Sequence, residues 1–306
     1  MRHKLLILLL IASVGSAALV NDVRSAIAEN NFTHAENLIR NYRKQSGTTP
    51  EMLEALSWMA RAEFARKQLD AAEKHAVETQ NLVAEYLKRR PGVDAENHLP
   101  IALGAAIEVE AQVTAARGER DQAVTFLRTQ LAAYRNTSIA TRIQKNIHLL
   151  SLEGKPAPAL DTGEYLGVKP PTLASLKGKA VLLFLWAHWC GDCKNLVPEL
   201  ARLGNDFSAR GLVVIGPTQR YGYAERGRDV VPAEELKYID AIRRQFYAPL
   251  LTMPVPVSQQ NFLNYGVSTT PTLVLIDRNG TVAMYHPGHM SYEELSRRVN
   301  RVLQAK

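Results

Sequence analysis

The sequence predicts an all-helical domain followed by an α/β domain in which helices flank a central mixed sheet. Residues 19–152 contain few Pro or Gly and repeat apolar residues at the i, i+3, i+4 spacing of amphipathic helices. Residues 153–306 instead alternate helical patterns with short apolar runs that are typical of buried strands. The only two cysteines lie between one such run and the helical pattern after it. A chain of 306 residues is long enough to form a hydrophobic core in each domain.

The first residues have the pattern of a secretory signal peptide. Residues 1–4 are Met-Arg-His-Lys, residues 5–14 are almost all apolar, and residues 15–18 are small. We therefore expect residues 1–18 to be removed and the protein to be exported to the periplasm or another extracytoplasmic space. An uncleaved N-terminal membrane anchor is the alternative. Because no cysteine lies directly after the apolar run, we do not expect a lipid anchor there. We also expect no later segment to reach a membrane-spanning length.

The charge of the chain argues against nucleic acid as a partner. The formal net charge is +7, and two of the basic residues lie in the predicted signal peptide. The other basic residues are interleaved with acidic ones on the expected helix surfaces, so they form no basic stripe.

Breaks in the helical pattern define about seven helices between residues 19 and 152. The breaks fall at residues 30–31, 47–50, 67–68, 90–93, 117–119 and 136–137. Three of the turns precede a small residue, Ala35, Ala72 or Ala123, which allows two helices to pack closely. Together with Leu56 and Ala60, this pattern resembles the tetratricopeptide repeat. The resemblance implies a surface that binds a protein partner, and a helical cap or spacer for the α/β domain is the alternative.

The α/β domain is expected to begin after the helix-breaking Gly-Lys-Pro-Ala-Pro at residues 154–158. A strand, a helix and a second strand follow in order, which predicts a parallel pair, and Asp277-Arg278-Asn279-Gly280 predicts a hairpin near the end. The predicted strands are residues 180–185, 211–216, 253–257, 272–276 and 281–285. The predicted helices are residues 194–210, 233–246, a short helix ending at 265, and 292–303.

A polar stretch, residues 217–232, interrupts this order. Within it, we expect residues 219–228 to form an exposed insertion without a dedicated role, although their Tyr and Arg side chains are of the kind that recognise a substrate.

Cys190 and Cys193 form a Cys-x-x-Cys pair at a strand-to-helix junction. The free N–H groups and the positive dipole end of a helix N-terminus stabilise a thiolate there, so Cys190 is the predicted reactive thiol and Cys193 the more buried resolving thiol. A structural zinc site needs four ligands. The chain offers only one cysteine pair and scattered histidines, so the sequence disfavours a structural zinc site. A purely structural disulfide would close too small a loop to stabilise the fold much. The spacing therefore favours thiol–disulfide exchange.

Two stretches resemble thioredoxin and occur in the same order. The first is Trp-Ala-His-Trp-Cys-Gly-Asp-Cys-Lys at residues 186–194, with Pro198 in the helix that follows. The second is Asn-Tyr-Gly-Val-Ser-Thr-Thr-Pro-Thr-Leu at residues 264–273, which leads into Asn279 and Gly280. The resemblance covers about the last half of the chain and implies a thioredoxin-like fold for the α/β domain.

Three further features resemble the TlpA/ResA-like branch of exported thiol–disulfide oxidoreductases. They are the opening residues 154–158, the Leu-Lys-Gly-Lys at residues 176–179, and the extra helix inserted after Ile215.

The resemblance implies roles for single residues. It makes Cys190 the thiolate that attacks a substrate disulfide and Cys193 the thiol that resolves the mixed disulfide. It makes Pro271 a cis-proline facing the sulfurs, next to a Thr270 backbone that can pair with an extended substrate strand. The residues it assigns to substrate binding are Trp189, Thr270, Pro271 and Gly288.

The sequence also departs from the family. The buried acid that thioredoxins carry six residues before the first cysteine is Phe184 here, and the Glu that ResA-like proteins carry three residues after the second is Leu196. Asp192, between the cysteines, is the nearest acid and is our predicted catalytic proton acceptor for Cys193. A solvated first-turn residue without a catalytic role is the alternative for Asp192. The other candidate proton acceptors are His188, His286 and His289.

Asp192 also bears on the direction of the reaction. A carboxylate close to Cys190 disfavours its thiolate, which destabilises the reduced form and makes the couple more reducing. The sequence therefore predicts a disulfide reductase that needs no cofactor besides its Cys190–Cys193 disulfide. Its expected partners are protein disulfides or dithiols and an unidentified electron donor.

Three other functions remain open at this point. One is net oxidation or isomerisation of disulfides. Another is a partner-binding protein whose helical repeats are the functional part and whose thioredoxin-like domain is a scaffold. The third is a Cu(I)-binding protein that uses Cys190, Cys193 and either His286 or His289.

Overall fold

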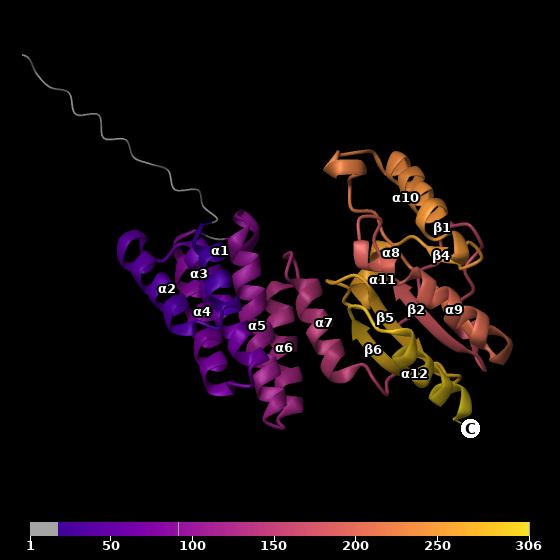
Figure 1. The fold of residues 1–306 in the computed structure, drawn as a ribbon, viewed down its shortest axis with the longest axis horizontal. Coiled ribbons are helices and arrows are strands. Elements are labelled where there is room, and N and C mark those ends of the chain that lie inside the picture. The colour runs from indigo at the N-terminus through magenta and orange to yellow at the C-terminus, as the bar shows by residue number, and fades with distance from the viewer. Residues whose placement is uncertain (1–17, 91, 306) are drawn as a thin grey trace, which may run out of the picture. The chain divides into compact units, whose positions relative to one another are not determined.

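The computed structural model describes residues 18–90 and 92–305. The predicted signal peptide therefore lies outside the described residues except for Ala18. The contacts between Cα atoms divide the chain into two compact units, one that ends at Gly118 and one that begins at Glu119 (Figure 1).

The N-terminal unit is helical, as predicted. Its α3, α4 and α5 all contact one another, and α1 and α2 contact each other and α3. Its elements are α1 (Ala18–Ala28), α2 (Phe32–Ser46), α3 (Pro50–Ala65), α4 (Leu69–Arg89), the 3₁₀ turn η1 (Val93–Ala95) and α5 (His98–Ala116).

Local chemistry explains where these helices begin and how closely they pack. At the start of α3, the Thr49 side chain accepts a hydrogen bond from the Met52 N–H, and Pro50 occupies the first turn, where its missing N–H costs nothing. Ala60 of α3 and Ala72 of α4 are fully buried in one apolar cluster with residues of α5. Small side chains at these positions let the helices approach closely. The tetratricopeptide-like repeat pattern itself stays a prediction.

Helix α5 is long and apolar enough to cross a membrane by length and composition. The sequence expectation that no segment after the signal reaches such a length is therefore wrong on these two criteria. In the structure, however, 56% of this stretch is buried inside the protein, and α5 contacts α3 and α4. A core helix of a folded unit passes the same test.

The C-terminal unit begins with two helices and continues into the α/β domain. Its helices are α6 (Arg120–Tyr134), α7 (Ala140–Ser151), α8 (Gly191–Asn195), α9 (Val197–Phe207), α10 (Pro232–Phe246), α11 (Gln259–Asn264) and α12 (Tyr292–Gln304). Its strands are β1 (Tyr165–Leu166), β2 (Ala180–Leu185), β3 (Leu212–Ile215), β4 (Val255–Pro256), β5 (Thr272–Ile276) and β6 (Val282–Pro287). Its 3₁₀ turns are η2 (Leu173–Leu176), η3 (Ser208–Arg210), η4 (Glu225–Gly227) and η5 (Ala248–Leu250).

The central sheet is mixed, as predicted, with the strand order β3-β2-β5-β6. β2 and β3 run parallel, and β5 is antiparallel to both β2 and β6. β1 and β4 form a separate antiparallel pair, so the proline-containing segment around residue 255 is indeed a short strand outside the central sheet.

Both faces of the sheet are covered, which explains why every residue of β2 is buried. Because side chains alternate along a strand, Leu182 and Phe184 enter one apolar cluster, with residues of α9, α10 and α12. Leu183 and Leu185 enter a second cluster, with residues of α11 and the end of α7.

One predicted helix is divided in two. The sequence suggested a single helix over residues 194–210, but the structure ends α8 at Asn195, starts α9 at Val197 and closes with η3. Pro198 occupies the first turn of α9. Proline lacks the N–H that a continuous helix needs at this point, so it is tolerated at a helix start and interrupts a helix interior.

The limits of the units differ from the limits read from the sequence. The contacts group α6 and α7 with the α/β domain, whereas the sequence placed residues 19–152 in one helical domain and began the next at residue 153. Helices do form on both sides of the limit at residue 118, as the sequence predicted for residues 19–152. The limits of independently folding domains remain a prediction.

Candidate active site

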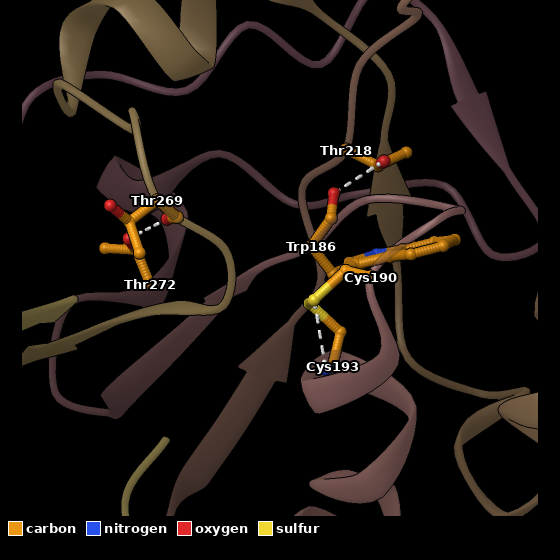
Figure 2. The surroundings of a disulfide bond; sticks show 6 residues. All are labelled: Trp186, Cys190, Cys193, Thr218, Thr269 and Thr272. Carbon is orange, nitrogen blue, oxygen red and sulfur yellow. Dashed lines mark hydrogen bonds between the residues drawn. A yellow bond between two sulfur atoms is a disulfide. The ribbon is translucent and has the colours of Figure 1, made fainter. Parts of the chain in front are cut away.

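The site lies where β2 ends. Trp186, the next residue, is fully buried, and its indole N–H donates to the Gly216 carbonyl at 2.9 Å. Its backbone is fixed on both sides. Its N–H donates to the Pro217 carbonyl, and its carbonyl accepts from the Thr218 hydroxyl at 2.8 Å (Figure 2). These bonds tie the segment before the cysteines to the chain after β3.

Cys190 and Cys193 form a disulfide at the start of α8 (Figure 2). The Cys190 N–H bonds the Ala187 carbonyl, which closes a tight turn through His188 and Trp189. Cys190 caps α8, and its Sγ accepts a hydrogen bond from the Cys193 N–H at 3.1 Å. A donor aimed at this sulfur favours its thiolate once the disulfide is reduced. Cys190 is 3% exposed and Cys193 is fully buried.

The strand register brings Pro271 and Gly288 to the same end of the sheet. Thr272 pairs with Leu185, the last residue of β2, and with Pro287 at the end of β6. The peptide bond between Thr270 and Pro271 is cis, as the resemblance implied. The Gly288 N–H donates to the Pro271 carbonyl at 2.7 Å.

The turn that contains Pro271 is held in shape. The Thr272 hydroxyl donates to the Thr269 carbonyl at 2.7 Å, and Figure 2 shows this turn together with the disulfide. Gly288 has a φ of +106°, which disfavours any residue with a side chain.

Trp189 is a large apolar side chain that is exposed in this region, with half of its surface accessible. Its ring meets the edge of Tyr221 with 5.6 Å between the ring centroids. Tyr221 comes from the polar insertion after β3, so this insertion reaches the residue that directly precedes Cys190.

His188 and Glu235 form a buried pair that the sequence analysis did not anticipate. Each side chain is 1% exposed, and His188 Nε2 lies 3.5 Å from Glu235 Oε1. The Glu235 carboxylate also accepts the backbone N–H groups of Tyr221 and Gly222. Burial lowers the pKa of His188, and the nearby Glu235 charge only partly opposes this effect. An acid in the first turn of α10 was the only sequence signal for Glu235.

The other predicted proton acceptors lie in different settings. Asp192 is exposed in the first turn of α8. His286 Nε2 contacts the His289 carbonyl at 3.1 Å, and His289 Nε2 lies 3.1 Å from Glu199 Oε2. Which of these groups takes the proton from Cys193 stays a prediction.

The two positions that depart from the family are apolar and buried. Phe184 and Leu196 are each fully buried. In the part of the chain that the structure describes, no three His, Cys, Asp or Glu side chains gather as a metal site requires.

Comparisons with known proteins agree with this geometry. A model of the AhpC/TSA family matches residues 154–285. The thioredoxin-like protein YneN of Bacillus subtilis (strain 168) is 27% identical over 149 residues, which are 48% of this chain and 79% of YneN. The thiol-disulfide oxidoreductase ResA of Geobacillus thermodenitrificans (strain NG80-2) is 26% identical over 132 residues, 42% of this chain and 67% of ResA.

Similar chains also occur among solved structures. A thiol:disulfide interchange protein of the thioredoxin family from Chlorobium tepidum TLS covers 49% of this chain and 96% of its own length, with 22% identity and a TM-score of 0.38. The Cys190–Cys193 disulfide, the mixed sheet and these relatives lead to one conclusion. Residues 154–285 match the AhpC/TSA family and have a thioredoxin-like fold, and the chain is a thiol–disulfide oxidoreductase with a helical N-terminal region.

Proposed function

We propose that this chain is an exported disulfide reductase that acts on protein substrates through Cys190 and Cys193. The observation that carries the proposal is the placement of the disulfide. Its N-terminal sulfur receives the Cys193 N–H, and the register of the sheet sets the Pro271 and Gly288 backbones at the same end as Cys190. Backbone groups at such a place are available to an extended substrate segment.

The proposed reaction transfers two electrons to the substrate. The Cys190 thiolate attacks one sulfur of a substrate disulfide, which forms a mixed disulfide and releases the other substrate sulfur as a thiolate. Cys193 loses its proton and attacks Cys190, which closes the Cys190–Cys193 disulfide and releases the second substrate thiolate. Solvent protonates the two substrate thiolates. A dithiol electron donor then reduces the enzyme and is itself oxidised to a disulfide.

The mechanism is tested by trapping. The Cys193→Ser variant should accumulate mixed disulfides between Cys190 and its substrates, which disappear when a thiol is added. The Cys190→Ser variant is the control and should form none. If the two variants give the same adducts, the assignment of the attacking thiol is wrong.

The reducing direction rests on Asp192, which lies between the two cysteines in the sequence and is exposed in the first turn of α8. Its charge disfavours the Cys190 thiolate and hence the reduced form. The Cys190–Cys193 couple should therefore be well below the roughly −120 mV of a strongly oxidising disulfide donor. A measured potential near that value would instead support net oxidation.

Export rests on the signal-like pattern of residues 1–18 and is tested by determining the N-terminus and location of the mature protein.

A further inference from the structure

The segment inserted between β3 and α10, residues 217–231, is fastened to the domain rather than free in solvent. The Arg220 guanidinium donates two hydrogen bonds to the Glu164 carboxylate. The segment also folds back on itself, since the Val230 N–H donates to the Gly222 carbonyl. The first residues of this segment are therefore held in place, whereas these contacts do not test the expectation that the insertion has no dedicated role.

Glu235 joins this segment to the turn that precedes Cys190. Its two carboxylate oxygens each accept one backbone N–H, from Tyr221 and Gly222, and one of them also lies 3.5 Å from His188 Nε2. A carboxylate that is 1% exposed is costly to bury unless its oxygens accept hydrogen bonds, and here the inserted segment supplies both donors. The position of the segment therefore depends on Glu235.

Aromatic rings complete the connection. His188 meets the edges of Tyr221, Tyr223 and Tyr238 at centroid distances between 5.3 and 5.6 Å. Tyr221 also meets the edge of Trp189, which is half exposed directly before Cys190. A shift of the segment would therefore move the ring against which Trp189 packs.

We infer that Glu235 is a positioning residue for the recognition of protein disulfides, because it holds Tyr221 against Trp189 and so fixes one wall of the docking surface beside Cys190. The inference deepens the proposed function and rests on it. Cys190 is only 3% exposed and directly follows the half-exposed Trp189, so a polypeptide that presents its disulfide to Cys190 would lie against Trp189. A small disulfide such as oxidised glutathione has little surface to place on this wall. The two kinds of substrate should therefore respond differently when the wall loosens.

The test compares Glu235→Gln with Glu234→Gln. Glu234 is the neighbouring acid, half exposed and bonded to Arg228, so it is a matched control outside the wall. A glutamine at position 235 has one acceptor oxygen, and its amide group would face the second backbone N–H as another donor. Each variant is reduced in advance, freed of reductant and mixed either with native, disulfide-bonded insulin or with oxidised glutathione. The change in Trp fluorescence of the variant then reports its oxidation.

For Glu235→Gln, the half-saturating concentration of insulin should rise about fivefold, the usual scale for losing one well-placed contact, while the limiting rate stays within about twofold. The rate with oxidised glutathione should also stay within about twofold of that of Glu234→Gln. Equal half-saturating concentrations for the two variants would overturn the inference. So would an equal loss of rate with both substrates, because this would indicate damage to the thiol chemistry rather than to docking.

A second variant keeps the test decisive if Glu235→Gln does not fold. Tyr221→Leu removes the ring that contacts Trp189 but keeps both backbone N–H groups that Glu235 binds. It should raise the half-saturating insulin concentration in the same way, and an unchanged value would overturn the inference. The underlying function is tested separately with the wild type and Cys190→Ser. If these two reduce insulin equally slowly, the proposed function fails, whatever the Glu235 variant does.

Discussion

Tyr247 carries a buried hydroxyl that makes no hydrogen bond among the described residues. Its ring packs on Trp186 with 4.5 Å between centroids and on Phe184 at 6.2 Å, close to the end of β2. Burial raises the pKa of this phenol, since the ionised form would lose its hydration. The ring of Tyr247 therefore stabilises the core, whereas its buried, unpaired hydroxyl lowers the free energy of unfolding.

Tyr247→Phe should leave the free energy of unfolding unchanged or raise it by up to about 1 kcal/mol, because it removes an unpaired polar atom and keeps the ring. Tyr265→Phe is the matched control. Tyr265 is equally buried, but its hydroxyl donates to the Pro158 carbonyl at 2.5 Å, so its loss should cost about 1–3 kcal/mol. Urea unfolding of both variants measures the difference. A loss for Tyr247→Phe as large as that for Tyr265→Phe would show that the Tyr247 hydroxyl has a partner.

Single residues also show where sequence-based prediction stopped. Cys190, Cys193 and Pro271 stand in local patterns, so their neighbourhood could be predicted from the sequence. Glu235 and His188 are 47 positions apart in the sequence, and no residue pattern around either one predicts that they contact each other. Their pairing depends on how α10 packs, which no local spacing encodes.

At the scale of elements, α7 packs on the loop that leads to the cis-proline. Gly266 lies in this loop with φ +59°, and a Cβ atom there would stand 2.6 Å from the Lys145 backbone nitrogen of α7. His148 of α7 contacts the Asn264 carbonyl through Nε2 at 2.9 Å, and the Tyr285 hydroxyl donates to the Tyr265 carbonyl at 2.8 Å. Helix α7 therefore helps to shape the approach to Thr270 and Pro271.

Gly266→Ala should lower the free energy of unfolding of the C-terminal unit by about 3 kcal/mol or more, because it combines a left-handed backbone with a clash against main-chain atoms. Gly204→Ala is the control. Gly204 lies inside α9 with open space around it, so alanine there should raise stability by up to about 1 kcal/mol. Thermal or urea unfolding measures both. If Gly266→Ala is no less stable than Gly204→Ala, α7 does not pack on this loop.

The elements of the α/β domain could be predicted well because each has its own pattern. β2 and β5 match the expected residues 180–185 and 272–276, and α10 and α12 each begin within one residue of their predicted starts. The attachment of α7 could not be predicted, because its apolar residues have the same helical spacing whether they face other helices or the sheet. Periodicity tells which face of a helix is buried but not against what.

At the scale of the whole molecule, the two units carry buried histidines of opposite character. In the N-terminal unit, burial works to lower the pKa of His75, but its hydrogen bond to Glu63 at 2.7 Å and the charges of Glu63, Glu36 and Glu78 outweigh this effect and raise it. In the C-terminal unit, burial lowers the pKa of His148 and of His188. The Asn264 carbonyl works to raise the pKa of His148, and the Glu235 carboxylate works to raise that of His188, but burial outweighs both interactions.

These shifts predict opposite responses to pH on the two sides of the ordinary histidine pKa of 6.5. A raised pKa means that folded His75 binds a proton more readily than the unfolded chain does. Its stabilisation of the N-terminal unit is complete below 6.5 and is lost as the pH rises through the folded pKa. A lowered pKa means that unfolding exposes His148 and His188 to protonation. Their contribution to the C-terminal unit is complete above 6.5 and is lost as the pH falls below it.

Between pH 8 and pH 5.5, the free energy of opening should therefore fall with decreasing pH in the C-terminal unit and rise in the N-terminal unit. Acids whose pKa is lowered, such as Asp161, Glu164 and Asp240, titrate below this window and do not mask the effect. Hydrogen exchange with mass spectrometry measures both units in the full chain, after correction for the intrinsic pH dependence of exchange. His75→Gln should weaken the trend in the N-terminal unit alone, where burial also raises the pKa of Glu110 and acts with the same sign. His148→Gln should weaken the trend in the C-terminal unit alone. Trends of the same sign in both units would contradict a raised pKa for His75 together with lowered pKa values for His148 and His188.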